Sequence, residues 1–404
     1  MARRVLLVES GSGYGGSAFS LLRLVKSLDP SRYEAHVVVF HHASAFEQIR
    51  ALDVQVMTSR LLRPLFERSP DDRHLWTRAR NYCAVYGNLA VDTLYNGFRL
   101  ARYIRRKHIE LVHLNNGLFG NLSAAFAARL AKVPCVSHER GAEGPTRVER
   151  QFVDWVSVVI TLNRASVAEY VPVFGADKVR LIPNGVDLDA FRAPDAQRIR
   201  HELGIEPGAF AVGTFARLVD GKGIPEFVTT AARVSRKFGP CQFFIIGNDP
   251  TAARTLEARM RKLADGFGLG RQLVFTGWRN DRIDIMAAMD LVLQISTTFP
   301  EGMSLSPLEA MALGKPVIVT NIPGYEFSVD DGETGFVVAP ADIDALTEKV
   351  LILARDRDLA QRMGRQGYLK AQRQFDVRLT ARQVEMVYDQ LLERPDSRPG
   401  LCVT

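Results

Sequence analysis

Short apolar runs alternate with amphipathic, helix-like segments along most of the chain. Strand-like runs in the first half are RRVLLVES (3–10), AHVVVF (35–40), ELVHLNN (110–116), PCVSHE (134–139) and SVVITLN (157–163). The alternation breaks at 182–197 and restarts with FAVGTFA, CQFFIIG, QLVFTG, LVLQIS and PVIVT, between 210 and 320. Strand–helix alternation of this kind predicts parallel sheets with right-handed crossovers.

The break at 182–197 predicts a linker between two domains of the same α/β class. This segment contains Pro183, Gly185 and Pro194, which disfavour a regular helix or strand. A chain of 404 residues is also too long for one ordinary hydrophobic core. We expect an N-terminal domain over 1–185, a C-terminal domain over 186–378, a last helix over 379–394 and a polar tail over 395–404.

Composition places the chain among soluble globular proteins, with 47% hydrophobic and 24% charged residues. The four cysteines are far apart and form no C-x-x-C, so we expect no zinc ribbon or redox pair. The apolar run after MARR is shorter than that of a secretory signal, and no run has the length of a transmembrane helix. These features favour a cytoplasmic protein.

The net charge of +7 is concentrated in one segment. Eleven basic and four acidic residues lie between Arg60 and Lys107, an excess equal to the whole net charge. This argues against a general nucleic-acid binder and for one local basic surface. The helix expected over 85–106 carries a polar stripe of Asn88, Asp92, Asn96, Arg99, Arg102 and Arg106. Either this is a core helix whose polar stripe faces water, or its arginines and the neighbouring apolar residues contact an anionic membrane surface.

A glycine-rich turn, ESGSGYGG (9–16), follows the first predicted strand. Gly11, Gly13 and Gly16 fit G-x-G-x-x-G, but an NAD site also needs a carboxylate after the second strand. That strand ends at Phe40 and is followed by His41 and His42, which argues against a dehydrogenase. The turn serves either to bring backbone amides close to an anion or only to turn the chain tightly.

Two glutamates eight positions apart carry the stronger signal in the second half. Glu301 follows the strand LVLQIS, and Glu309 falls in the helix that starts near Ser306. Backbone amides of Gly302, Met303, Ser304 and Leu305 can point into the crevice at the carboxyl end of the strand. Carboxylates accept hydrogen bonds from sugar hydroxyls. Alternatively, Glu309 interacts with the helix dipole and Glu301 is a solvated turn residue.

Arg217 and Lys222 follow the first strand of the second half, in ARLVDGKG. A guanidinium and an ammonium together suit a diphosphate, although either could be an exposed turn residue. Together with the two glutamates and the glycine-rich turn they describe a nucleotide-sugar site.

At this point the sequence closely resembles glycosyltransferase family 4, whose members are retaining enzymes. The resemblance rests on YGGSA, SHERG (137–141), IPNGVD (182–187), ARLVDGKG (216–223), FTGWRND (275–281) and EGMSLSPLEAMALGKPV (301–317), the last with the family's Glu-x7-Glu motif. It implies the GT-B fold: two Rossmann-like, doubly wound parallel-sheet α/β domains facing a central cleft, with the final helix crossing back to the first domain.

The resemblance also implies a role for each matching residue. Glu301, with the amides of 302–305, would contact the donor hexose, and Glu309 would hold the ribose. Arg217 and Lys222 would neutralise the diphosphate, and Gly15 and Gly16 would lie beneath it. His138 matches an active-site histidine near the transferred sugar. Ala216 stands where the family often has glycine, and residues 57–107 match nothing general in the family.

No metal and no cofactor are expected besides the donor substrate. Asp187-Leu188-Asp189 has the D-x-D form that other glycosyltransferases use for manganese, but it lies in the predicted linker. We read it as a turn.

The resulting prediction is a retaining hexosyltransferase that builds a cell-surface polysaccharide or glycolipid. The resemblance favours UDP over GDP, and an acceptor that is a glycan or lipid-linked, with peripheral contact to an anionic inner membrane face through 60–107. Two alternatives stay open: a catalytically silent partner subunit that binds sugar nucleotides, and an enzyme like sucrose or trehalose synthase with a small soluble acceptor.

Overall fold

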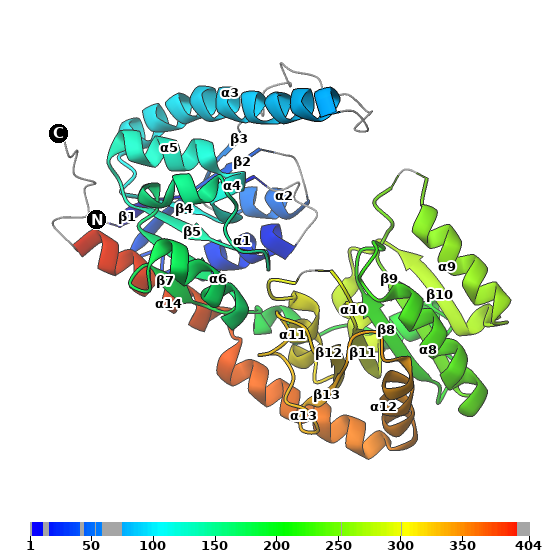
Figure 1. The fold of residues 1–404 in the computed structure, drawn as a ribbon. Helices are drawn as coiled ribbons and strands as arrows, with labels where there is room; N and C mark the ends of the chain where they lie inside the picture. The colour runs from blue at the N-terminus through cyan, green and yellow to red at the C-terminus, as the bar shows by residue number, and fades with distance from the viewer. Residues whose placement is uncertain are drawn as a thin grey trace. The chain divides into compact units, whose positions relative to one another are not determined.

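The computed structural model describes residues 2–10, 16–40, 44–52, 54–58, 75–251, 253–299 and 301–393. The described chain forms two compact units, one of 1–183 with 380–404 and one of 184–379. Each contains a parallel sheet covered by helices (Figure 1). The prediction of two parallel-sheet α/β units is confirmed. The first boundary falls at 183/184, compared with 185/186 expected from the sequence.

The first unit has a seven-stranded sheet in the order β3-β2-β1-β4-β5-β6-β7. Most of its strands are largely buried apolar runs, as expected for a parallel sheet with both faces covered. They are β1 (Arg3–Glu9), β2 (Tyr33–Val39), β3 (Gln55–Thr58), β4 (Leu111–Leu114), β5 (Cys135–His138), β6 (Val158–Thr161) and β7 (Val179–Leu181).

Helices cover both faces of this sheet (Figure 1). One core joins α1 (Gly16–Ser27), α2 (Ser44–Arg50) and α14 (Val377–Glu393) to β1 and β2. The other core joins α3 (Leu75–Lys107), α4 (Gly117–Gly120), α5 (Leu122–Ala131) and α6 (Arg164–Phe174) to the opposite face. The last helix therefore packs on the first unit although it follows the second in sequence.

The second unit repeats the topology, with a six-stranded sheet in the order β10-β9-β8-β11-β12-β13. The strands are β8 (Phe210–Phe215), β9 (Cys241–Ile246), β10 (Leu273–Gly277), β11 (Leu291–Gln294), β12 (Val317–Thr320) and β13 (Gly335–Val338). In both sheets the order reverses beside the first strand, at β1/β4 and at β8/β11. Ligands in doubly wound sheets bind outside the carboxyl ends of strands at such a switch point.

The helices of the second unit also cover both faces. The main core holds α8 (Ile224–Lys237), α9 (Thr255–Gly266) and α12 (Ile343–Arg355) against one face, where Leu291 and Leu293 of β11 point. The unit further contains α7 (Ala196–Glu202), α10 (Arg282–Ala288), α11 (Leu305–Ala312) and α13 (Arg357–Gln374). Because α11 directly follows the loop after β11, its start lies at the switch point.

Several local predictions differ from the structure. Residues 149–155 form two short 3-10 turns, Glu149–Gln151 and Val153–Trp155, and the predicted linker already contains the start of α7. The sequence pattern missed α2, β3 and β7. The first part of the basic segment 60–107 lies outside the described residues, and α3 begins at Leu75.

The structure contradicts the polar stripe predicted on α3 in two ways. Asn96 is fully buried and its Nδ2 donates to Asp92 Oδ1 at 2.8 Å. Leu94, Tyr95 and Phe98 are instead about half exposed, on the side that also carries Arg99 and Arg102. The outer surface of α3 thus mixes apolar and basic side chains. Within the described residues, no helix is both long and apolar enough to cross a membrane.

Candidate functional site

The candidate residues of the second unit meet at the carboxyl ends of β8 and β11. The turn 217–223 follows β8, and the loop 295–304 follows β11. Thr297 N donates to Gly221 O at 2.7 Å. Gly221 and Gly223 have φ of +82° and +74°, and a Cβ on Gly223 would lie 2.0 Å from Ile295 O. Glycine is therefore required for this turn to lie against the loop.

Glu301 and Lys222 form a buried ion pair at this junction. The Lys222 ammonium donates to Glu301 Oε1, and the two side chains are only 12% and 9% exposed. The Lys222 Nζ also lies 4.0 Å from the centre of the Phe299 ring, with the Arg217 guanidinium carbon 5.8 Å from it. The two cations and Glu301 are thus brought together, as the sequence predicts.

All the hydrogen bonds that the structure gives Glu301 fall on one oxygen. Ser296 Oγ donates to Oε1 at 2.7 Å and Tyr325 OH donates to it at 3.2 Å, beside Lys222. Burial raises the pKa of Tyr325 well above its ordinary value, so its hydroxyl keeps its proton. Within the described residues Oε2 has no hydrogen-bond partner, and it stays available to a ligand hydroxyl.

The pKa of Lys222 lies below its ordinary value of 10.5. Burial is the largest cause, the Arg217 charge adds to it, and the Glu301 carboxylate opposes it. Removing an ammonium from water disfavours the charged form, and an adjacent carboxylate favours it. The site therefore holds a cation whose proton is less firmly bound than in an exposed lysine.

Gly302, Met303, Ser304 and Leu305 connect Glu301 to α11. Ser304 is the N-cap of α11 and makes no capping hydrogen bond through its side chain, as far as the described residues show. Asn184 Nδ2 donates to Met303 O at 3.1 Å and holds the loop in place. The first amides of a helix lack intrahelical partners and carry partial positive charge, so this start suits an anionic or hydroxyl-bearing ligand.

Glu309 lies one turn into α11 and is 1% exposed. Arg282, the first residue of α10, donates to both of its carboxylate oxygens, from Nη1 to Oε2 and from Nη2 to Oε1, the latter at 2.8 Å. Burial is the largest effect on the pKa of Arg282 and lowers it, but the Glu309 charge and its hydrogen bonds together outweigh burial and raise that pKa. The two hydrogen bonds from Arg282 hold the Glu309 carboxylate in one orientation.

The sequence did not single out the groups that hold these residues. Ser296 ends a predicted strand, and Tyr325, Phe299 and Arg282 belong to no recognised spacing. Asn184 falls in the predicted linker, within the IPNGVD motif. Apart from Ser296, which lies 5 residues before Glu301, these partners are 24 to 119 residues from the groups they contact, so no local pattern reveals them.

The candidates of the first unit lie at the carboxyl edge of its own sheet. Gly16 is the exposed first residue of α1, and Gly15 lies outside the described residues. Glu9, at the end of β1, is buried and accepts from Asn115 Nδ2. Arg140 Nη2 donates to Asn115 Oδ1 at 2.7 Å. A polar network therefore joins the end of β1 to the residue after β4, at the β1/β4 switch point.

His138 ends β5 and has no exposed surface. Its Nδ1 lies 3.3 Å from His113 Nε2, and His113 Nδ1 lies 2.8 Å from Tyr388 OH on α14. Burial, helped by the Arg140 charge, lowers the pKa of His113 to about 3 and that of His138 well below its ordinary value. In this conformation His138 is a neutral core group without surface for a sugar, so the role implied by the resemblance stays a prediction.

Asp189 lies in a short 3-10 turn, Leu188–Phe191, and Asp187 precedes it as the N-cap residue. Asp187 Oδ1 accepts from Asp189 N at 3.2 Å, and Asp189 pairs with Arg192. Across the part of the chain that the structure describes, no three His, Cys, Asp or Glu side chains gather in the manner of a metal site.

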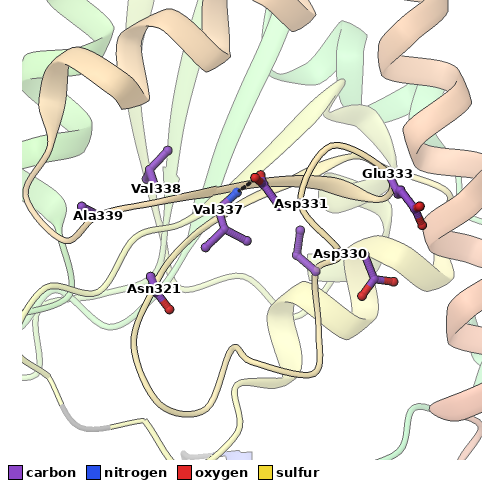
Figure 2. A pocket seen from close by; sticks show the side chains of 8 residues that line it. Asn321, Asp330, Asp331, Glu333, Val337, Val338 and Ala339 are labelled. Carbon is purple, nitrogen blue, oxygen red and sulfur yellow. Dashed lines mark hydrogen bonds between the residues drawn. The ribbon is translucent and has the colours of Figure 1, made fainter.

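A hollow of about 740 Å³ lies elsewhere on the second unit, beyond the ends of β12 and β13. Figure 2 shows Asp330, Asp331 and Glu333 around it, with Asp331 accepting from Val337 N. It contains none of the candidate residues. Its carboxylates would repel an anionic ligand, in contrast to the two cations at the ends of β8 and β11.

Two family models match the chain, one after the other. "Glycosyltransferase Family 4" matches residues 14–190 and "Glycosyl transferases group 1" matches 195–370. Together they span nearly all of both units.

Curated relatives are glycosyltransferases of glycolipid, lipopolysaccharide and capsule synthesis. An Escherichia coli UDP-Gal:alpha-D-GlcNAc-diphosphoundecaprenol alpha-1,3-galactosyltransferase is 28% identical over 70% of this chain and 74% of its own. A Mycobacterium tuberculosis GDP-mannose-dependent alpha-(1-6)-phosphatidylinositol monomannoside mannosyltransferase is 31% identical over 57% of this chain. The match spans 61% of that mannosyltransferase, about three fifths of its length.

Solved structures share the fold over the whole chain. Anabaena HepE, in complex with UDP and glucose, has a TM-score of 0.77 at 22% identity, covering 96% of this chain and 99% of its own. WaaG, a glycosyltransferase of lipopolysaccharide biosynthesis, has a TM-score of 0.64 at 16% identity, covering 96% of this chain and 99% of its own. At these identities the likeness concerns the fold, which is GT-B.

Proposed function

Because the chain is a glycosyltransferase of the family 4 type with the GT-B fold, we propose that it transfers a hexose from a nucleoside-diphosphate sugar with retention of the anomeric configuration. UDP is the favoured nucleotide and GDP the second choice. The acceptor is a glycan or lipid-linked glycan in surface polysaccharide or glycolipid synthesis. The E. coli and M. tuberculosis relatives, named for lipid-linked acceptors, support this acceptor class.

One observation carries the donor assignment. Three donors converge on Glu301 Oε1 and fix the carboxylate, while Oε2 stays available at the start of α11. A carboxylate held in this way can accept hydrogen bonds from hexose hydroxyls. Arg217 and Lys222, beside the same Phe299 ring, then lie where a diphosphate joined to that hexose would be. Glu309, one turn further along α11, is assigned to the ribose.

The reaction breaks the bond between the anomeric carbon and a phosphate oxygen. Negative charge grows on the departing diphosphate, and the sugar acquires oxocarbenium character. Lys222, Arg217 and the amides at the start of α11 would stabilise the departing charge more than the ground state. The acceptor hydroxyl forms the new bond on the face that the diphosphate leaves, and its proton passes to the leaving phosphate. No protein nucleophile is required.

The proposal is tested by nucleotide release without acceptor. The protein is incubated with UDP-glucose, UDP-galactose, UDP-N-acetylglucosamine or GDP-mannose in the presence of EDTA, and free nucleoside diphosphate is measured. Slow release from one donor is expected, and its persistence in EDTA would support a metal-independent reaction, since two cations already face the diphosphate. NMR of the released sugar should show the donor's anomer first. No release from any donor, with or without added Mn²⁺, would count against the assignment.

The alkaline limb of the pH profile should reflect Lys222. Its lowered pKa means that the ammonium loses its proton at a lower pH than an exposed lysine, whose value is 10.5. We therefore expect kcat/KM for the donor to fall with rising pH at a midpoint below 10.5. A profile flat to pH 10.5, with intact fold by circular dichroism, would contradict this role for Lys222. Because kcat/KM follows the free enzyme, its midpoint is the relevant one.

We further propose that the outer surface of α3 contacts an anionic membrane. Leu94, Tyr95 and Phe98 are 50%, 47% and 59% exposed, and Arg99 lies 5.4 Å from the Tyr95 ring. Exposed apolar side chains beside arginines suit a surface of anionic lipid.

Vesicle co-sedimentation tests this surface. We expect binding to phosphatidylcholine vesicles that contain phosphatidylglycerol, weaker binding without it, and a loss of about 10-fold for Leu94→Gln/Phe98→Gln. The control is Met386→Gln, which removes one exposed apolar side chain from α14. Equal binding of both variants would rule out α3 as the contact.

A further inference from the structure

A hollow of about 470 Å³ lies at the edge of the second sheet where its strands begin. Phe210 opens β8, and Asp290 and Pro316 directly precede β11 and β12. Because the strands are parallel, this edge is opposite the one that carries the candidate donor residues. Among the described residues that line it, three are cations, Arg200, Lys315 and Arg357, and one is a carboxylate, Asp290. No part of the proposed chemistry uses this basic hollow.

Lys315 brings a partly buried ammonium group to the basic hollow. Within the described residues, its Nζ makes no hydrogen bond or ion pair. Burial is the largest effect on the pKa of Lys315 and lowers it below 10.5, while the Asp290 charge opposes this shift and the Arg200 charge adds to it. A cation that is withdrawn from water without a paired carboxylate costs free energy. An anionic ligand in the basic hollow would offset that cost.

The two arginines are held by backbone carbonyls and share one carboxylate. Arg200 Nη2 donates to Ala209 O at 3.0 Å, and Arg357 Nη2 donates to Gly208 O at 2.9 Å. Asp290 Oδ2 lies 3.4 Å from Arg200 Nη1 and 3.5 Å from Arg357 Nη1. Three cations against one carboxylate leave an excess of two positive charges in the lining. The basic hollow therefore attracts anions.

The wall that carries Lys315 is closely packed. A Cβ on Gly364 of α13 would lie 2.0 Å from Gly314 O, so only glycine allows this approach of α13 to the turn after α11. Lys315 N donates to Ala310 O at 2.9 Å, which ties the same turn to the end of α11. The backbone around the ammonium is thus arranged before any ligand binds, and this lowers the entropic cost of binding.

We propose that the basic hollow binds a phosphate monoester of a small metabolite. Guanidinium and ammonium groups bind phosphate oxygens through charge-assisted hydrogen bonds. A volume of about 470 Å³ lies in the range of small-molecule sites and leaves room beside a phosphate for the group esterified to it. The inference does not rest on the donor assignment, because none of the candidate donor residues lines the basic hollow.

Competitive acetylation of lysines tests the site in the full chain. The rate of labelling by acetic anhydride is measured for each lysine by peptide mass spectrometry, with and without glycerol 3-phosphate, ribose 5-phosphate, fructose 6-phosphate or inorganic phosphate. Sodium chloride at equal ionic strength is the reference, so that screening alone gives no difference. At about 10 mM, an ester with a Kd near 1 mM would slow the labelling of Lys315 by about 10-fold. Lys349, which pairs with Glu348 on α12, should label at the same rate throughout.

Two arginine variants show whether the protection comes from the basic hollow. Arg357→Met removes one of the three cations and should reduce the protection of Lys315 to about 2-fold or less, since a lost charged hydrogen bond weakens binding about 10-fold. Arg233→Met is the control. Arg233 pairs with Asp344, which is 93% exposed, and lies outside the lining, so this variant should keep wild-type protection.

The wild-type measurement needs no variant, so the test stands even if Arg357→Met does not fold. Protection of Lys315 by at least one ester, with weaker protection by inorganic phosphate, would support the proposal. Stronger protection by inorganic phosphate than by all three esters would overturn the assignment to a monoester. The absence of protection by any of them, or equal protection in wild type and folded Arg357→Met, would overturn the site. None of these results bears on the donor site.

Discussion

Replacing Lys222 by methionine is expected to lower kcat for sugar transfer by about 100-fold or more, the typical cost of losing one donor to a developing charge. Methionine keeps most of the side-chain volume beside Phe299 but removes the ammonium. The Arg217 guanidinium would be left as the side-chain cation at the diphosphate. The measurement is single-turnover transfer or donor hydrolysis at saturating donor, which separates kcat from binding.

Lys349→Met is the matched control for this change. Lys349 Nζ also lies near a phenylalanine ring, 5.0 Å from the centre of Phe336, and pairs with the exposed Glu348. The Lys349→Met substitution should leave kcat unchanged. The fold of Lys222→Met should persist because Ser296 and Tyr325 still donate to Glu301. A folded Lys222→Met protein with wild-type kcat would contradict the role given to the ammonium.

Glu301→Gln should have an effect of similar size, a loss of about 100-fold in kcat/KM for the donor. The substitution keeps the shape of the side chain but replaces one carboxylate oxygen by an amide that donates. The amide can face two ways. In one orientation the acceptor for Lys222, Ser296 and Tyr325 is lost, and in the other the acceptor offered to the hexose is lost. Because the Glu301 charge opposes the lowering of the Lys222 pKa, the alkaline limb should also move to lower pH.

Glu257→Gln is the corresponding control. Glu257 is a buried residue of α9 that accepts from Arg261 Nη2 at 2.8 Å, and its replacement should affect neither kcat/KM nor the pH profile. An unchanged alkaline limb in Glu301→Gln, together with an unchanged kcat/KM, would show that the pair is only structural.

The parallel sheets of both units follow from the sequence because their strands are continuous apolar runs separated by helical patterns. The elements that the pattern missed are short or marginal. β7 has three residues, of which one is buried and one is exposed, and β3 has four at the sheet edge. The turns at 149–155 carry apolar residues without a full helical period, and they form 3-10 turns instead.

The positions of Glu301, Lys222 and Arg217 could be predicted because each directly follows a strand that ends at the switch point. Their partners could not, because the pairs join residues far apart, such as Lys222 with Glu301 and Arg282 with Glu309. His138 illustrates a further limit. A residue that ends a strand can point to a ligand or into a core, and here His138 contacts His113 of β4, which in turn contacts Tyr388 of α14.

The most direct test of the central claim is a thermal-shift panel of UDP, GDP, ADP and NAD on the wild type, Lys222→Met and Glu309→Ala. A ligand that binds only the folded state raises the melting temperature, by an amount that grows with the logarithm of its concentration relative to Kd. The proposed site predicts stabilisation by UDP or GDP, reduced in both variants. Stabilisation by NAD alone, or an equal shift in all three proteins, would contradict it.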